Sequence, residues 1–459
     1  MFWLKCGKEN QKFVRVRTCC SRGFLMTGLV LVTAVFFCSV FYAYGATRQQ
    51  GIKQASTRLF PILQNGKYGY INKMGDIVIN PQFRYALGYK NGFARVEVGN
   101  KYTYIDKSGR MIAKPQFSYP LDFSEGLARV EINGKYGYVN EAGKIVIRPR
   151  FEGALSFNEG LALVEYGGKN GYIDKTGKFV IKPQFGGDGA ENFKNGLAFV
   201  EVDHKFGYID RTGKMVVKPQ LKGVLDFEEG LAAIKTGNKY GYINKRGKMV
   251  IKPQFDYAYP FREGIAGVKV GNKYGYINKD GNIIAKAQFD SIDYFHEGLA
   301  VVSIGNRYGY IDKHGRMVIK PQFDYARAFC EGRAVVKAGN KYGYVDKHGN
   351  TIAKPRFDYA LDFKDDIARV KNNGKYGYID RDGKVIAKPQ FDGALDFKDG
   401  RALVMTGNKF GYIDETGKII VQPRFDSAED FKEGLARVET GNKWGYIDKT
   451  GKFVWDPSN

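Results

Sequence analysis

The chain has 459 residues and a formal net charge of +24, and 43% of its residues are hydrophobic. Glycine contributes 58 residues, and tyrosine and phenylalanine contribute 31 and 33, a composition that suits short strands joined by tight turns. The hydrophobic content excludes a disordered chain, and the positive charge allows attraction to nucleic acid, anionic lipid or acidic glycan, although solvation of exposed faces is the commoner reason for such a charge.

The N-terminal segment has the features of a membrane signal. Residues 1–22 form a basic leader, with Lys5, Lys8, Lys12, Arg15, Arg17 and Arg22 against Glu9. Residues 23–46 contain no charge, and a helix of that length spans roughly 36 Å, enough to cross a bilayer core of about 30 Å. We expect a retained signal-anchor with the leader in the cytoplasm and the rest across the membrane.

The alternative is a cleaved signal peptide, because residues 43–45 (Ala-Tyr-Gly) have the small-x-small form of a cleavage site. Cys19 and Cys20 beside this segment could accept acyl chains, although inert thiols are the simpler interpretation. Cys330 alone lies beyond the N-terminal segment, so no disulfide can form within the rest of the chain.

A linker at residues 47–56 is followed by a repeated unit that fills residues 57–459. A phrase of the type Lys-Tyr-Gly-Tyr-Ile-Asp recurs twelve times, and the residue between its two aromatic positions marks the phase: Gly69, Thr103, Gly137, Gly171, Gly207, Gly241, Gly275, Gly309, Gly343, Gly377, Gly411 and Gly445. Ten of the eleven steps are 34 residues, and the step from Gly171 to Gly207 is 36. A fixed period predicts units that stack and share a core.

One unit, residues 127–151, predicts three antiparallel strands. Residues 127–132 alternate between apolar and polar, Asn133-Gly134 predicts a tight turn, and residues 135–140 form the second strand. Gly143 marks a second hairpin, and residues 144–149 form a third strand whose proline indicates a sheet edge. The connector that comes next is expected to be held to the core by aromatic residues.

Twelve three-stranded meanders give roughly 36 strands, whereas open sheets rarely exceed about 10 without curling. The array must therefore form a coiled solenoid or superhelix, or close into propeller-like rings. Propellers usually have about 4–8 blades of four strands, so the open coil is the favoured prediction and rings are the alternative.

These motifs resemble the WG-repeat family of bacterial proteins, also called KWG repeats. The resemblance covers nearly all of the array: Trp444 to Pro457 matches the first two segments of the family pattern, and Phe431 to Ala436 matches the third. The chain departs from the pattern at the eponymous tryptophan, which only Trp444 keeps. The resemblance implies an exported or envelope repeat protein without established chemistry.

Two sets of residues are candidates for a ligand surface. Six lysines precede the repeat proline at one fixed phase, so stacking would align them into a ladder that could hold a polyanion: Lys182, Lys218, Lys252, Lys320, Lys354 and Lys388. Paired aromatics such as Tyr274 and Tyr276, and Trp444, could stack on sugars or choline, but a core position for these rings is the simpler interpretation.

The sequence indicates no catalytic, cofactor or metal site. Recurring acids such as Asp256, Asp324, Asp358 and Asp392 could form a glycosidase pair or bind calcium, but Asx-turns explain them more simply. If the protein were an enzyme, its active site would be expected at residues 186–192, because the insertion Gly186-Gly187-Asp188-Gly189 breaks the period there. Cys330 is expected to be a tolerated surface thiol.

The expected function is a membrane-anchored, extracytoplasmic scaffold that binds a protein or an envelope polymer such as an anionic glycan, without catalysis. We do not expect nucleic acid to be a partner. A carbohydrate-binding or glycan-processing protein and a passive spacer are the alternatives.

Overall fold

The computed structural model describes residues 58–456 apart from 187–188 and 222–226. The leader, the apolar segment at residues 23–46 and the linker at 47–56 lie outside the described residues, and so do the predictions made for them. The chain divides into two units, Met1–Ser56 and Thr57–Asn459, and every described strand belongs to the second unit. The described residues of that unit include no helix that is long and apolar enough to span a membrane.

Four kinds of strand recur along this unit. The first strands are β1 (Phe60–Gln64), β5 (Ala94–Val98), β7 (Leu127–Ile132), β11 (Ala162–Tyr166), β14 (Leu197–Val202), β17 (Leu231–Thr236), β21 (Ile265–Val270), β25 (Leu299–Ile304), β29 (Arg333–Ala338), β33 (Ile367–Asn372), β37 (Arg401–Thr406) and β41 (Leu435–Thr440). The middle strands are β2 (Lys67–Ile71), β6 (Lys101–Ile105), β8 (Lys135–Asn140), β12 (Lys169–Ile173), β15 (Lys205–Asp210), β18 (Lys239–Asn244), β22 (Lys273–Asn278), β26 (Arg307–Asp312), β30 (Lys341–Asp346), β34 (Lys375–Asp380), β38 (Lys409–Asp414) and β42 (Lys443–Asp448).

The third strands are β3 (Ile77–Phe83), β9 (Ile145–Phe151), β13 (Phe179–Gly186), β16 (Met215–Leu221), β19 (Met249–Phe255), β23 (Ile283–Phe289), β27 (Met317–Phe323), β31 (Thr351–Phe357), β35 (Val385–Phe391), β39 (Ile419–Phe425) and β43 (Phe453–Trp455). Two-residue short strands precede some of the first strands: β4 (Tyr85–Ala86), β10 (Gly153–Ala154), β20 (Tyr257–Ala258), β24 (Ser291–Ile292), β28 (Tyr325–Ala326), β32 (Tyr359–Ala360), β36 (Gly393–Ala394) and β40 (Ser427–Ala428).

These strands form twelve antiparallel sheets of three or four strands, numbered 1 to 12 in chain order, which confirms the predicted meander. In a complete sheet such as sheet 4 the strand order is β10-β11-β12-β13. The short strand, which the sequence prediction missed, comes after the third strand of the preceding sheet with a single residue between them, Glu152 in this case. The chain therefore passes straight from the edge of one sheet to the edge of the next.

Two kinds of hairpin set the strand register. Asn133 and Gly134 have φ angles of 51° and 74°, so both turn residues are left-handed, as a type I′ hairpin requires. At the second hairpin, the side chain of Asn140 accepts the N–H groups of Ala142 and Lys144 at 3.1 and 2.9 Å, and Gly143 takes a φ of 79°. The recurring Asp or Asn at the end of the middle strand thus forms an Asx-turn.

The marker glycine admits a close approach of the third strand. Tyr136 and Tyr138 pair with Phe151 and Ile147, so the third strand bulges between these pairs. A Cβ atom on Gly137 would lie 2.5 Å from the Ile147 carbonyl oxygen and 2.6 Å from the Pro149 nitrogen. The close neighbour of this glycine is thus the third strand of its own sheet.

The core lies between consecutive sheets. One cluster joins Tyr138, Ile147 and Phe151 of sheet 3 to Phe157 and Val164 of sheet 4, and all are buried. The Tyr138 hydroxyl donates to the Leu155 carbonyl at 2.6 Å and thereby ties sheet 3 to sheet 4. Equivalent bonds run from Tyr70, Tyr104, Tyr172, Tyr242, Tyr276, Tyr310, Tyr344, Tyr378 and Tyr412.

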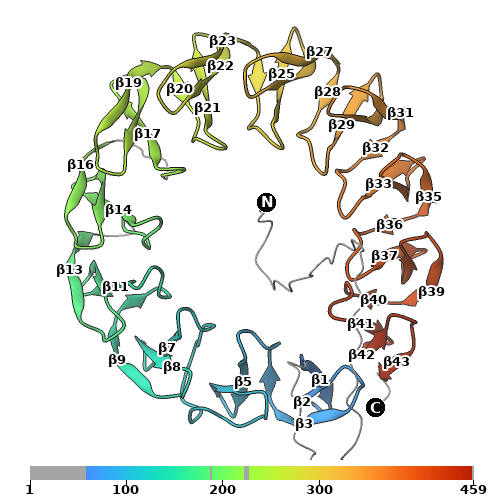
Figure 1. The fold of residues 1–459 in the computed structure, drawn as a ribbon. Helices are drawn as coiled ribbons and strands as arrows, with labels where there is room; N and C mark the ends of the chain where they lie inside the picture. The colour runs from blue at the N-terminus through green and yellow to red at the C-terminus, as the bar shows by residue number, and fades with distance from the viewer. Residues whose placement is uncertain (1–57, 187–188, 222–226, 457–459) are drawn as a thin grey trace, which may run out of the picture. The chain divides into compact units, whose positions relative to one another are not determined.

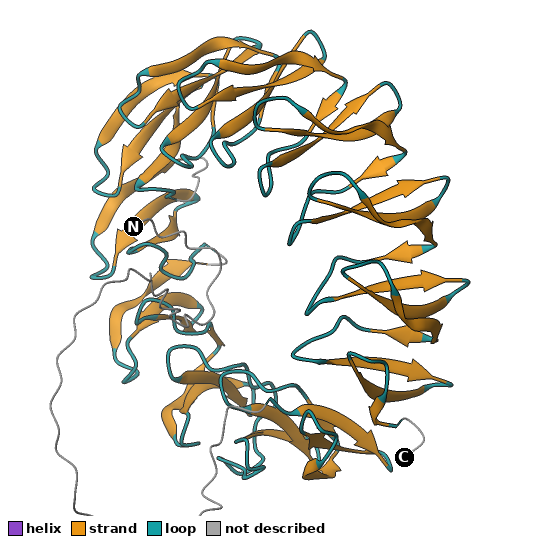
Figure 2. Ribbon diagram, turned by 45° about the vertical axis from the view of Figure 1, so that its right-hand side comes forward, coloured by secondary structure: helices purple, strands orange, loops and turns teal. Residues whose placement is uncertain are grey.

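The twelve sheets close into one propeller-like ring (Figure 1). The second view agrees, with the sheets placed one after another around an open centre (Figure 2). Phe60 and Ile62 of sheet 1 share a buried cluster with Tyr446 and Trp455 of sheet 12. The Tyr446 hydroxyl donates to the Pro61 carbonyl at 2.9 Å. The prediction of an open coil is therefore wrong: the strands do not continue one wide sheet but form separate sheets that pack face to face.

Candidate binding surface

Eight consecutive sheets present a basic residue at one position of the third strand, the fourth residue of β9, β13, β16, β19, β23, β27, β31 and β35. This basic belt consists of Arg148, Lys182, Lys218, Lys252, Lys286, Lys320, Lys354 and Lys388. All eight are exposed. None of these side chains has a hydrogen bond or ion pair with a described residue. Third strands such as β31, β35 and β39 lie at the outer rim of the ring (Figure 1).

The belt comprises all six lysines that the sequence predicted and two residues that it missed. Lys286 is followed by Ala287 rather than proline, and Arg148 is not a lysine, so a search for a Lys-Pro pair passes over both. The distance to the marker glycine would have found them. Beyond these eight sheets, Lys114 lies at the same distance from its marker in sheet 2, where residues 111–117 form isolated bridges instead of a third strand, and Asn80 and Gln422 take the position in β3 and β39.

A second set of cations is neutralised by acids, which distinguishes it from the belt. Lys239 at the start of β18 pairs with Asp256 at 2.6 Å, and the other carboxylate oxygen of Asp256 accepts the Gly271 N–H at 2.8 Å. The Lys239 ammonium and the Gly271 N–H lower the pKa of Asp256 below its ordinary value. The same pairing joins Lys135 to Glu152, Lys273 to Asp290, Arg307 to Asp324, Lys341 to Asp358, Lys375 to Asp392 and Lys409 to Asp426.

These contacts correct the interpretation of Asp256, Asp324, Asp358 and Asp392. They do not form Asx-turns. Each binds a cation of its own sheet and, through the second oxygen, the first-hairpin turn of the next sheet. The described residues contain no cluster of three or more His, Cys, Asp or Glu side chains that could hold a metal ion.

The aromatic candidates lie in different environments. Tyr276 is 1% exposed and its hydroxyl donates to the Asp293 carbonyl at 2.6 Å, so its ring belongs to the core. Burial raises the pKa of this phenol well above its ordinary value. Tyr274 is half-buried with the Lys269 ammonium 5.3 Å from its ring centre. Trp444 is half-buried too, and the Arg437 guanidinium lies 4.1 Å from its ring.

The insertion that breaks the period lies only partly in the described part of the chain, because residues 187–188 fall outside it. A hollow of 360 Å³ next to it is lined by Glu191, Asn192 and Lys194, among others. Glu191 is the one carboxylate among its described lining residues. A pair of carboxylates for glycoside chemistry is therefore not assembled from those residues.

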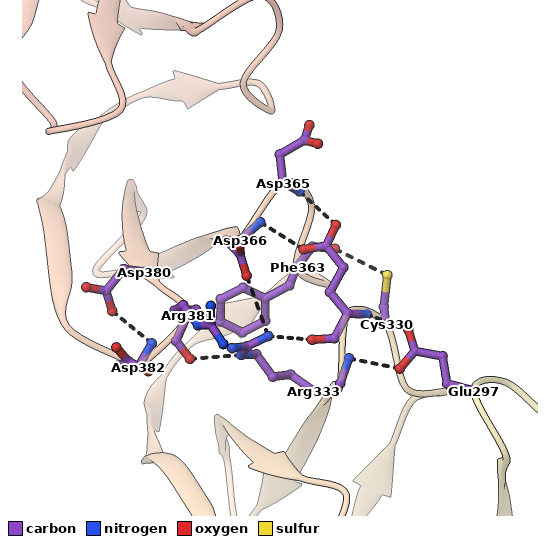
Figure 3. Close-up of polar contacts among 11 residues, drawn as sticks. Glu297, Cys330, Arg333, Phe363, Asp365, Asp366, Asp380, Arg381 and Asp382 are labelled. Atoms are coloured by element: carbon purple, nitrogen blue, oxygen red, sulfur yellow. Dashed lines mark hydrogen bonds and ion pairs between the residues drawn. The ribbon is translucent and has the colours of Figure 1, made fainter. Parts of the chain in front are cut away.

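Cys330 is half-buried rather than a plain surface thiol. Its Sγ donates to the Phe363 carbonyl of the next sheet at 3.3 Å (Figure 3). Desolvation raises the pKa of this thiol. The residue thus takes part in the contact between sheets 9 and 10.

A family model, the WG containing repeat, matches eleven consecutive segments between residues 68 and 444, from 68–102 to 410–444. The chain belongs to the WG-repeat family. In this WG-repeat chain each matched segment spans parts of two sheets, because it begins within one middle strand and ends within the next.

Other comparisons add little to the description of this WG-repeat protein. No curated protein shows a significant match to its sequence. A crystal structure of the eukaryotic initiation factor is similar over 72% of this chain and 97% of its own, with 11% identity and a TM-score of 0.31. PorZ, a surface component of the type-IX secretion system of Porphyromonas gingivalis, is similar over 84% of this chain and 65% of its own, with 11% identity and a TM-score of 0.23. TM-scores this low support no argument about function.

Proposed function

We propose that this WG-repeat ring is a non-catalytic scaffold that binds an anionic envelope glycan along the basic belt. The observation that carries the proposal is the run of eight exposed cations at one position of eight consecutive sheets, without a partner among the described residues. The acids nearest in the chain, such as Asp256, are already paired with other lysines. The belt residues therefore keep charges that no ion pair with a described residue neutralises.

The repeated spacing favours a polymer over a small anion. Each exposed cation contributes only about 0.2–1 kcal/mol to an ion pair, but successive contacts along one polymer act at a high effective concentration. A polyuronate carries carboxylates along its whole length and can therefore contact several cations of such a row. We further propose that residues 23–46 anchor the protein in the cytoplasmic membrane with the ring on the outer side, since the apolar stretch is long enough to span a bilayer.

The test is binding of the full chain to a polyuronate and to neutral dextran, at low and at physiological salt. The belt variant replaces Lys252, Lys320, Lys354 and Lys388 with glutamine. We expect saturable binding of the polyuronate at physiological salt and a loss of about tenfold or more in the variant, because four contacts are removed.

A matched control removes the same charge elsewhere. Replacing Lys239, Lys273, Lys341 and Lys375 with glutamine lowers the net charge equally, but these lysines are already paired with aspartates. Binding should then fall by less than about threefold at physiological salt, where the Debye length is about 8 Å. Equal losses in both variants would mean that net charge alone attracts the polymer, and would reject the belt as a site.

A further inference from the structure

The junction between sheets 12 and 1 differs in what lies beside the first strand from the ten junctions where the described residues include this place, that is, all others except the one before sheet 6. In eight sheets a short strand pairs with it, and in sheets 3 and 5 equivalent backbone hydrogen bonds do so, such as Leu121 N–H to the Arg129 carbonyl at 2.9 Å. In sheet 1 the order is β1-β2-β3, so β1 is an edge strand within the described residues. Edge strands offer unpaired backbone groups to an added strand.

The register of β1 shows which groups face outward. Leu63 lies opposite Tyr68 and Pro61 opposite Tyr70, and both are non-hydrogen-bonded pairs, since the pair Gln64–Lys67 closes the two-residue turn. Pro61 has no N–H, and its carbonyl accepts the Tyr446 hydroxyl. Leu63 therefore directs an N–H and a carbonyl away from β2 without a partner in the described part of the chain.

A hollow of 580 Å³ lies along this edge, between the β1–β2 hairpin and the β41–β42 hairpin. Trp444 and Trp455 line it, and its charged lining residues are Arg437 and Lys443, with no acid among them. Lys443 is exposed and forms no ion pair with a described residue. The hollow thus combines a free strand edge, aromatic rings and positive charge.

The junctions at which a short strand pairs with the first strand show which residues fit a hollow of this kind. Lys375, the counterpart of Lys443 in sheet 10, pairs with Asp392, which directly precedes the short strand Gly393–Ala394. The hydroxyl of Tyr378, the counterpart of Tyr446, donates to the Leu395 carbonyl at 2.7 Å. An acid, two small residues in extended conformation and one more carbonyl therefore complete a junction.

We infer that the junction between sheets 12 and 1 is a binding site for an extended acidic peptide of a partner protein. The peptide adds to β1 by hydrogen bonds to the Leu63 N–H and carbonyl, and its acidic side chain pairs with Lys443. This is strand addition, in which backbone bonds supply affinity and side-chain contacts supply specificity. The site is separate from the basic belt, so each stands or falls independently of the other.

The experiment titrates the full chain with a synthetic peptide of residues 390–397, Gln-Phe-Asp-Gly-Ala-Leu-Asp-Phe, and monitors tryptophan fluorescence. Two of the three tryptophans of the chain, Trp444 and Trp455, line the hollow, and the peptide contains none. We expect a saturable change. The variant Lys443→Gln should bind about three- to fivefold more weakly, as expected for an exposed ion pair.

A second peptide with asparagine in place of its first aspartate identifies the ion pair. It should bind the parent protein and Lys443→Gln equally, because only the aspartate can pair with the lysine. Absence of a saturable change, including the case in which another part of the chain covers the hollow, overturns the inference. The inference is also overturned if the loss of affinity from Lys443→Gln and the loss from the asparagine peptide add up independently. In that case Lys443→Gln would bind the asparagine peptide more weakly than the parent protein does.

A separate pair of variants tests whether the peptide pairs with β1. Leu63→Pro removes the outward N–H, whereas Leu63→Ala keeps it and removes only an exposed side chain. We expect Leu63→Pro to abolish the fluorescence change and Leu63→Ala to retain it, with unchanged circular dichroism and Tm in both. Full binding by a folded Leu63→Pro protein would contradict pairing with β1.

Discussion

Two aromatic residues of each middle strand, two positions apart, have different roles. In β30, Tyr344 is fully buried and donates to the Leu361 carbonyl of the next sheet at 2.7 Å, whereas Tyr342 is half-buried and its hydroxyl bonds to no described residue. Burial also raises the pKa of the Tyr344 phenol, so it stays protonated and can donate at any ordinary pH. The second aromatic position therefore requires a hydroxyl for this hydrogen bond, whereas the first position does not.

The variant Tyr344→Phe should lower the free energy of unfolding by about 1–2 kcal/mol, because the Leu361 carbonyl loses its donor in a buried place. Tyr342→Phe is the matched control and should change it by less than about 0.5 kcal/mol. Urea unfolding monitored by circular dichroism measures both. Equal effects would show that the hydroxyl between the sheets contributes nothing.

Within one sheet, the marker residue of the middle strand lies directly against the third strand. A Cβ atom on Gly343 would lie 2.5 Å from the Ala353 carbonyl oxygen and 2.7 Å from the Pro355 nitrogen. Sheet 2 has Thr103 at this position, with its Oγ1 donating to the Ala113 carbonyl at 2.6 Å. Residues 111–117 there form isolated bridges instead of a strand. The threonine thus coincides with the loss of regular pairing.

Gly343→Thr should therefore displace β31 and lower stability by roughly 1–3 kcal/mol, the usual cost of overpacking. Hydrogen exchange should become faster in residues 351–357. Threonine at Ala338, an exposed position of β29, is the control and should leave exchange unchanged. Slow exchange in β31 of the Gly343→Thr protein would mean that the bulge can accept a side chain.

The turns before the first strands link the sheets through acids. The Glu297 carboxylate accepts the N–H groups of Glu331 and Gly332 at 2.7 and 2.8 Å, and Glu331 repeats this contact with Asp365 and Asp366 (Figure 3). Burial alone would raise the pKa of Glu297, but the Gly332 N–H and the Lys347 ammonium outweigh it and lower the pKa. The contact therefore stabilises the fold only while the carboxylate is ionised.

Because the folded pKa of Glu297 is depressed, its contribution is present above its unfolded pKa of about 4.3 and is lost as the pH falls through the folded value. Glu297→Gln should cost about 1 kcal/mol at pH 7 and progressively less as the pH falls below about 4. Thermal unfolding across this range measures the difference. Glu141→Gln, at an exposed turn, is the control, and a Glu297 effect that does not change with pH would contradict the charged contact.

At the scale of the whole molecule, closure joins residues at opposite ends of the array. Phe60 packs edge-on against Tyr446 with ring centres 5.6 Å apart, and Arg58 pairs with Glu433 at 2.8 Å. A closed ring has no free terminal sheet face. Loss of one contact at the closure should therefore expose both end sheets together.

Phe60→Ala should lower stability by roughly 3 kcal/mol through the cavity it leaves and should speed hydrogen exchange in sheets 1 and 12 at once. Phe397→Ala, which removes the ring packed on Tyr378, should act on sheets 10 and 11 instead. Unchanged exchange in sheet 12 of the Phe60→Ala protein would indicate that the ring is open in solution.

The period, the three long strands, the turn glycines and the buried second tyrosine could all be predicted from the amino-acid sequence. Each depends on residues within one unit of 34, where local backbone preferences and alternation suffice. Six of the eight belt residues were predicted for the same reason; Arg148 was missed because it is not a lysine, and Lys286 because Ala287 rather than proline follows it.

Three features could not be predicted without the fold: the closure of the twelve sheets, the contacts of Asp256 and its counterparts with neighbouring sheets, and the contact of Cys330 with the next sheet. Closure depends on the small rotation between packed sheets, which accumulates over twelve units and is encoded in no single repeat. Contacts such as Phe60 to Tyr446 join residues far apart in the chain, so no pattern within one repeat predicts them. The hollow at the junction between sheets 12 and 1 results from that closure, since it exists only where the two ends of the array meet.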